Sequence, residues 1–143
     1  MADLDALVAS PWWRWMPGML ATGPGWFGEA RLVEVDSDGD PCLWTYRGYV
    51  RGPAAANRAA DTSPWDSPEA RPDPTDPATL GCLLALAREA WGDPELFVRR
   101  EIGGPNWVTI RPGHAQPFRC DTEAAALIAA ILAAPTPGSP SAG

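Results

Sequence analysis

The residues that could do acid–base or thiol chemistry are few and far apart in this chain. His114 is its one histidine, and its three cysteines, Cys42, Cys82 and Cys120, form no CxxC pair. The chain has no GxSxG elbow, no HExxH and no Gly-rich phosphate loop. A catalytic triad would need Cys82 or Cys120 brought to His114 by the fold. We therefore predict no catalytic residue and no metal site, with His114 on an exposed loop.

Two further kinds of site are excluded by composition and spacing. All eleven basic side chains are arginine, so the chain offers no lysine for a Schiff base or a P-loop. The segment Asp36–Asp40 looks superficially like a calcium loop, but Pro41 is its sixth residue, where such a loop needs glycine. Because Asp38-Gly39 tolerates the positive φ of a hairpin turn, we predict a turn there and no cofactor.

Tryptophan is the unusual component, with eight in 143 residues. Trp12, Trp13 and Trp15 stand on an irregular segment, and such neighbours cannot all face one small interior. Tryptophan beside arginine, here Arg14, is typical of binding hot spots. Trp65 is the bulky residue of a Pro-rich stretch. These five residues are the predicted partner- or ligand-binding site, which serves either a protein interface or a pocket for a small molecule or nucleotide.

The charge is acidic overall and unevenly distributed. A net charge of -7 argues against a nucleic-acid partner, because phosphate neutralisation needs clustered positive side chains. The stretch from Asp61 to Asp76 holds five acids against Arg71, whereas four arginines stand against two glutamates between Pro94 and Arg119. The N-terminus lacks a signal-peptide pattern, and no apolar run approaches the ~20 residues of a membrane span. We therefore predict a cytoplasmic chain with no membrane partner.

Periodicity and turn residues predict five elements. They are a helix over 3–10, a hairpin of 31–36 and 42–47, a helix from Pro77 to Trp91, a hairpin of 95–100 and 106–111, and a helix over 122–134. Asp76 and Asp121 are the predicted N-caps of the two longer helices, and Gly92 ends the first of them. The ββαββα order predicts an α+β fold, an antiparallel four-stranded sheet with two helices packed on one face. We expect one domain over 1–134, with a Pro-rich loop at 52–75 and a disordered tail at 135–143.

The two longer helices differ in how much of their surface is apolar. The predicted core stripe of the first is Leu80, Leu83, Leu84, Ala87 and Trp91, and that of the second is Ala124, Leu127, Ile128, Ile131 and Leu132. The opposite face of the second helix is nearly all alanine. A helix that is apolar on every side is either buried on two faces or covered by a partner. The last helix is therefore also a candidate surface for self-association.

Three segments carry a resemblance to a known family. They are Trp13–Met19 (W-R-W-M-P-G-M), Asp76–Pro94 (which begins D-P-A-T-L-G-C) and Thr122–Ala134. They resemble segments of uncharacterised small proteins of bacteriophages and prophages. The resemblance implies a phage or prophage origin and action inside the host cell, and it brings no catalytic or ligand residues. Relatives tend to have acids where this chain has Ala125 and Ala133, which implies a more apolar outer face on its last helix.

These observations favour a non-enzymatic accessory protein of phage or prophage type. It would act by binding another protein inside the cell, for example by inhibiting a host or antiviral-defence protein. The alternative is a small-molecule or nucleotide binder that uses the tryptophans as a stacking wall. An enzyme with a dispersed site around His114 is the least favoured hypothesis.

Overall fold

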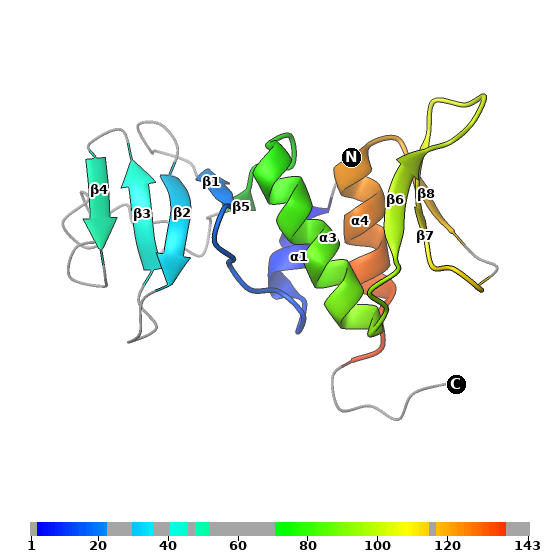
Figure 1. Ribbon diagram of the computed structural model, residues 1–143, viewed down its shortest axis with the longest axis horizontal. Coiled ribbons are helices and arrows are strands. Elements are labelled where there is room, and N and C mark those ends of the chain that lie inside the picture. The colour runs from blue at the N-terminus through cyan, green and yellow to red at the C-terminus, as the bar shows by residue number, and fades with distance from the viewer. Residues whose placement is uncertain are drawn as a thin grey trace. The chain divides into compact units, whose positions relative to one another are not determined.

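The computed structural model describes residues 3–22, 30–35, 41–45, 48–51, 71–114 and 117–136. Helices and antiparallel strands are both present, which confirms the predicted α+β class. The chain divides into two compact units, a central unit (Trp15–Cys82) and a terminal unit (Met1–Arg14 with Leu83–Gly143). Helix α3 (Pro77–Trp91), drawn in green in Figure 1, contributes residues to both.

The central unit contains a five-stranded antiparallel sheet with the order β4-β3-β2-β1-β5. Its strands are β1 (Leu20–Thr22), β2 (Ala30–Val35), β3 (Pro41–Thr45), β4 (Gly48–Arg51) and β5 (Arg71–Pro72). The first predicted hairpin is confirmed as β2 and β3, which pair with a register shift between Leu32 and Glu34. The sequence did not reveal β1, β4 and β5, because two to four residues are too few to show a hydrophobic period. The predicted turn at 36–40 lies outside the described residues.

A hydrogen-bonded ion pair joins β2 to the start of α3 in the central unit. Arg31 Nη2 and Nη1 donate to the two carboxylate oxygens of Asp76 at 2.8 and 3.0 Å. Asp76 is also the N-cap that the sequence predicts, since its Oδ2 accepts the Thr79 N–H at 2.9 Å. The Thr79 hydroxyl donates to the same oxygen and accepts the Leu20 N–H, each at 2.9 Å. One half-buried carboxylate, Asp76, thus links the start of the helix to β2 through Arg31 and to β1 through Thr79.

Helix α3 has the predicted bounds and a glycine-dependent end. Gly92 has a φ of 60°, and its N–H donates to Glu89 O, while Asp93 N–H donates to Arg88 O. This pair of bonds is a Schellman motif, which needs the left-handed conformation that glycine adopts without strain. The buried side chains are Thr79, Leu83, Leu86, Ala87 and Ala90. Three members of the predicted stripe, Leu80, Leu84 and Trp91, are only half-buried, so the buried arc of the helix is turned toward Leu86 and Ala90.

The terminal unit is built around helix α4 (Glu123–Ala133). Its other elements are α1 (Leu4–Ala9), β6 (Phe97–Arg100), β7 (Trp107–Ile110) and β8 (Phe118–Cys120). The second predicted hairpin is confirmed as β6 and β7, and the three-residue β8 extends it to a sheet with the order β6-β7-β8. Helix α4 packs on all three strands, and α1 packs against α4. The predicted first helix is confirmed, with Asp3 as its N-cap.

Burial within the unit explains why α4 is apolar on nearly every side. Its buried residues are Ala124, Ala125, Ala126, Leu127, Ile128, Ala130 and Ile131, whereas Leu132 is 40% exposed. The alanine face considered for self-association is therefore largely covered by the chain itself. The predicted cap at Asp121 is wrong by one residue, because Thr122 has the extended backbone of an N-cap and its Oγ1 accepts the Ala125 N–H at 3.1 Å.

The single four-stranded sheet predicted from the ββαββα order is not found. The first hairpin lies in the central unit's sheet and the second in the terminal unit's sheet. The short strands β1 and β4 pair with the two strands of the first hairpin, and β8 pairs with the second hairpin. The two hairpins do not pair with each other. Residues 52–70 of the predicted loop and 137–143 of the predicted tail lie outside the described residues. Within the described ranges, no helix is long and apolar enough to cross a membrane.

Candidate interaction surface

The predicted binding residues divide between the two units. Trp12, Trp13 and Arg14 belong to the terminal unit and Trp15 to the central unit. All three tryptophans are half-buried, and Arg14 is exposed. The structure therefore does not bring the predicted set together within one unit. Trp65 lies outside the described residues.

The polar atoms of the Trp12–Arg14 segment are already bonded within the terminal unit. Trp12 Nε1 donates to Pro135 O at 3.0 Å. Arg14 Nη1 and Nη2 bind the two carboxylate oxygens of Glu89 at 2.7 and 2.6 Å, and this bond raises the pKa of Arg14 and lowers the pKa of Glu89. Hot-spot residues use such polar groups as well as their apolar area. A partner at this segment could therefore contact the tryptophan rings, but Trp12 Nε1 and the Arg14 guanidinium already have hydrogen-bond partners within the unit.

The histidine and the described cysteines are not set up as a nucleophilic pair. His114 is exposed in a turn, as predicted, and its N–H donates to Arg111 O at 3.0 Å. Burial raises the pKa of the thiols of Cys120, on β8, and Cys82, in the central unit. A raised pKa keeps a thiol protonated, whereas an activated nucleophile needs a lowered one. Among the described residues, no three His, Cys, Asp or Glu side chains form a group that could hold a metal ion.

One face of the terminal sheet is closed by a cluster around Trp91. Trp91 Nε1 donates to Ala130 O of α4 at 2.8 Å, and its ring lies 6.2 Å from that of Phe118. The guanidinium carbon of Arg111 lies 4.1 Å from the Trp91 ring centroid, and its Nε is 3.8 Å from Asp93 Oδ2. These contacts identify the face that carries Phe118 as the one turned to α4.

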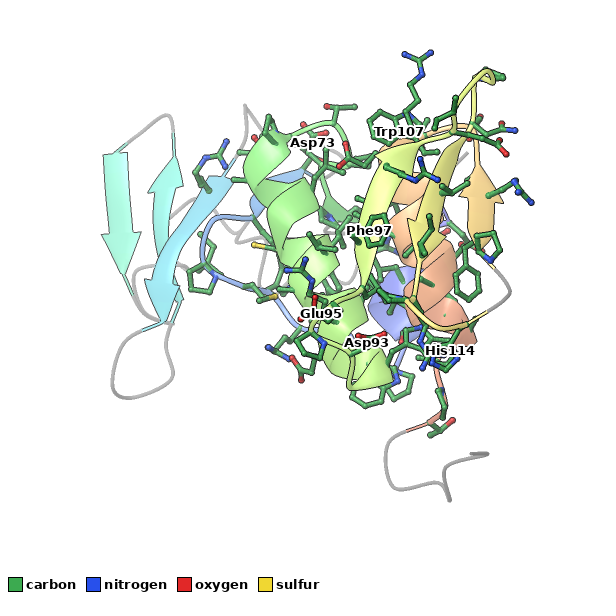
Figure 2. All side chains as sticks on the ribbon, turned by 45° about the vertical axis from the view of Figure 1, so that its right-hand side comes forward. Asp73, Asp93, Glu95, Phe97, Trp107 and His114 are labelled. Atoms are coloured by element: carbon green, nitrogen blue, oxygen red, sulfur yellow. The ribbon has the colours of Figure 1, made fainter. Side chains whose placement is uncertain are left out.

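The other face of this sheet carries Phe97, Arg99, Val108, Ile110 and Arg119, and we call it the open sheet face. Side chains alternate between faces along a strand, and directly paired residues share a face. Phe97, on β6 in Figure 2, is 36% exposed, and Arg99 is also exposed. Arg119 is 58% exposed although its Nε donates to Glu101 at 2.8 Å. On this face Phe97, Arg99 and Arg119 are therefore exposed to water, whereas Val108 is buried.

A second apolar group is exposed on the same hairpin. Ile102, in the connection between β6 and β7, is 85% exposed. Of the large apolar side chains that the structure describes, only Phe97, Ile102 and Leu132 are exposed, so two of three belong to this hairpin. The sequence has no motif or spacing that points to these residues. Its one signal was the excess of arginine between Pro94 and Arg119.

Comparisons with protein-family models, with curated proteins and with solved structures find no match to this chain.

Proposed function

We propose that this chain is a non-enzymatic protein that acts by binding another protein through the open sheet face and the β6–β7 hairpin. The observation that carries the proposal is the exposure of Phe97 and Ile102 beside Arg99 and Arg119. Aromatic residues and arginine are enriched in protein interfaces, where an apolar centre is surrounded by polar groups. An exposed apolar side chain alone needs no explanation, but two on one hairpin with the exposed Arg99 and Arg119 beside them favour a contact surface.

The proposed biological setting rests on the segments that resemble phage and prophage proteins. Trp13–Met19 and Asp76–Pro94 resemble phage and prophage proteins, and we propose an accessory role of that type inside the host cytoplasm. Part of that likeness also has a structural use, because a Cβ on Gly18 would lie 3.8 Å from both Ala78 Cβ and Cys82 Sγ, and Cys82 Sγ donates to Pro17 O at 3.3 Å. Pro17, Gly18 and Cys82, which belong to these motifs, thus pack together within the central unit.

A comparison of three variants tests where the partner binds. The tagged protein, a Phe97→Ser/Ile102→Ser variant and a Trp12→Ala/Trp13→Ala/Trp15→Ala variant are used to capture proteins from a bacterial host lysate. We expect one captured protein to be lost with the hairpin variant and retained with the tryptophan variant. Leu132→Ser, which changes an exposed apolar residue on α4, is the matched control. Loss with the tryptophan variant alone would move the interface to the predicted site and contradict the proposal.

The small-molecule alternative stays a prediction based on the same tryptophans. Titration of intrinsic tryptophan fluorescence with a panel of nucleotides tests it directly. Quenching that is abolished by the Trp12→Ala/Trp13→Ala/Trp15→Ala variant would support a pocket. An unchanged spectrum with every compound would remove this alternative.

A further inference from the structure

Strand β6 is an edge of the terminal sheet, and its hydrogen-bonding direction can be worked out. Glu101 N–H donates to Asn106 O at 2.8 Å at the hairpin end. Residues of an antiparallel strand alternate between bonding their partner strand and pointing their backbone groups away from it. Arg99 therefore bonds toward β7, while Val98 and Arg100 direct their N–H and C=O groups to the open edge.

Among the residues that the structure describes, only the start of this edge is covered by a hydrogen-bonding partner. The carbonyl of Leu96 points to the same side as those of Val98 and Arg100, and it accepts a hydrogen bond of 2.8 Å from Arg88 Nε on α3. In the described part of the chain, the outward backbone groups of Val98 and Arg100 make no hydrogen bond. A row of unpaired N–H and C=O groups is a template for another strand.

The charges beside this edge indicate what kind of strand would bind. The terminal unit has six arginines, which are Arg14, Arg88, Arg99, Arg100, Arg111 and Arg119. Four of them have partners described above, whereas Arg99 and Arg100 form no ion pair with any described residue. Being consecutive, these two side chains point to opposite faces of the sheet, so they would flank an added strand on both sides.

We infer that β6 accepts an extended acidic segment of the partner protein as a fourth strand, an inference that rests on the proposed function. In an antiparallel arrangement, two consecutive acids would lie opposite Arg100 and Arg99, and an apolar residue would lie opposite Phe97. Main-chain bonds give such a complex its affinity, and the flanking side chains give it specificity. A second copy of β6 fits poorly, because it would add two more arginines to the same ladder. Nucleic acid fits poorly as well, given the net charge of -7.

Synthetic peptides and amide NMR spectra of the full chain test this inference. The probe is acetyl-Thr-Glu-Glu-Val-Val-Thr-amide, whose two glutamates match Arg100 and Arg99. We expect it to shift the amide signals of Val98 and Arg100 and to slow their hydrogen exchange. A peptide with both glutamates replaced by lysine should bind about tenfold more weakly, and an Arg99→Glu/Arg100→Glu variant should reverse that preference.

Backbone methylation separates strand addition from simple charge attraction. A probe that is N-methylated on the residues facing Val98 and Arg100 keeps its charges. It loses the N–H groups that would donate main-chain hydrogen bonds to β6, and it should not bind. Equal binding of that peptide, or tighter binding of a single-stranded oligonucleotide, would overturn the inference. If no peptide binds while capture still depends on Phe97 and Ile102, strand addition fails and the proposed function stands. If the peptide binds while capture is unaffected by those residues, the proposed function fails instead.

Discussion

Arginine is used in opposite ways at two places in this molecule. Arg31 in the central unit binds Asp76 through two nitrogens and also donates to Gly18 O at 2.8 Å. Arg99 and Arg100 in the terminal unit are exposed on an edge strand and pair with no described residue. Both places lie on strands of antiparallel sheets. What differs is whether a carboxylate from a neighbouring element reaches the guanidinium.

This contrast separates structural residues from candidate binding residues. A guanidinium that is satisfied within its own unit contributes to folding, and removing its partner leaves a charge unpaired. A guanidinium left in water contributes little to folding and remains available to another molecule. The two sites should therefore respond very differently to the same kind of substitution.

The largest effect is expected at Asp76. The Asp76→Ala variant should lower the free energy of unfolding by about 2–4 kcal/mol, because it removes both a helix cap and the partner of a bidentate arginine. Urea unfolding followed by circular dichroism measures this change. A double-mutant cycle with Arg31→Ala should show a coupling well above zero. Additive effects would mean that the pair is not coupled.

Lowering the pH should reduce the stabilisation that the Arg31–Asp76 pair gives to the folded chain. The Arg31 hydrogen bonds lower the pKa of Asp76 from 3.8 to about 2 in the folded chain. Because the folded value lies below the unfolded one, the stabilisation is present above about pH 4 and is lost as the pH falls toward 2. After allowance for the exposure of Arg31 to water, about 1–2 kcal/mol should disappear over this window. The Asp76→Asn variant should lack this part of the pH dependence, and an identical profile would contradict the assignment.

The cap of α4 should give an intermediate effect in the terminal unit. Thr122→Ala removes the hydroxyl that accepts the Ala125 N–H and should cost about 1 kcal/mol. Asp121→Ala, one residue earlier, leaves this hydroxyl in place and should cost less than Thr122→Ala. Thermal unfolding of the two variants in parallel checks this order. A larger loss of stability for Asp121→Ala than for Thr122→Ala would indicate that Asp121 is the N-cap, as predicted from the sequence.

The smallest effect on folding is expected at the β6 edge. Arg99→Ala and Arg100→Ala should each change the free energy of unfolding by less than about 0.5 kcal/mol, because neither side chain has a described partner to lose. The same urea titrations provide the measurement. A loss comparable to that of Asp76→Ala would show that these arginines stabilise the fold, and the distinction between the two sites would fail.

Local elements of this protein could be predicted because their signals are local. Helix α3 has an acid that caps it, proline at its first position and glycine after its last residue, and the structure has the predicted bounds. Both hairpins alternate over enough residues to show a period of two. The cap of α4 was missed by one residue because Asp121 and Thr122 are both good caps, and only the backbone conformation selects one of them.

The sequence by itself determined the α+β class, the helices and the two hairpins, because capping, turn chemistry and hydrophobic periodicity act between residues near one another in the chain. Only the tertiary structure decided that the hairpins join separate sheets, that α4 buries its alanine face and that Arg14 binds Glu89 while Arg99 remains unpaired. Those outcomes depend on contacts between residues far apart in the chain, whose local patterns do not specify which segments meet.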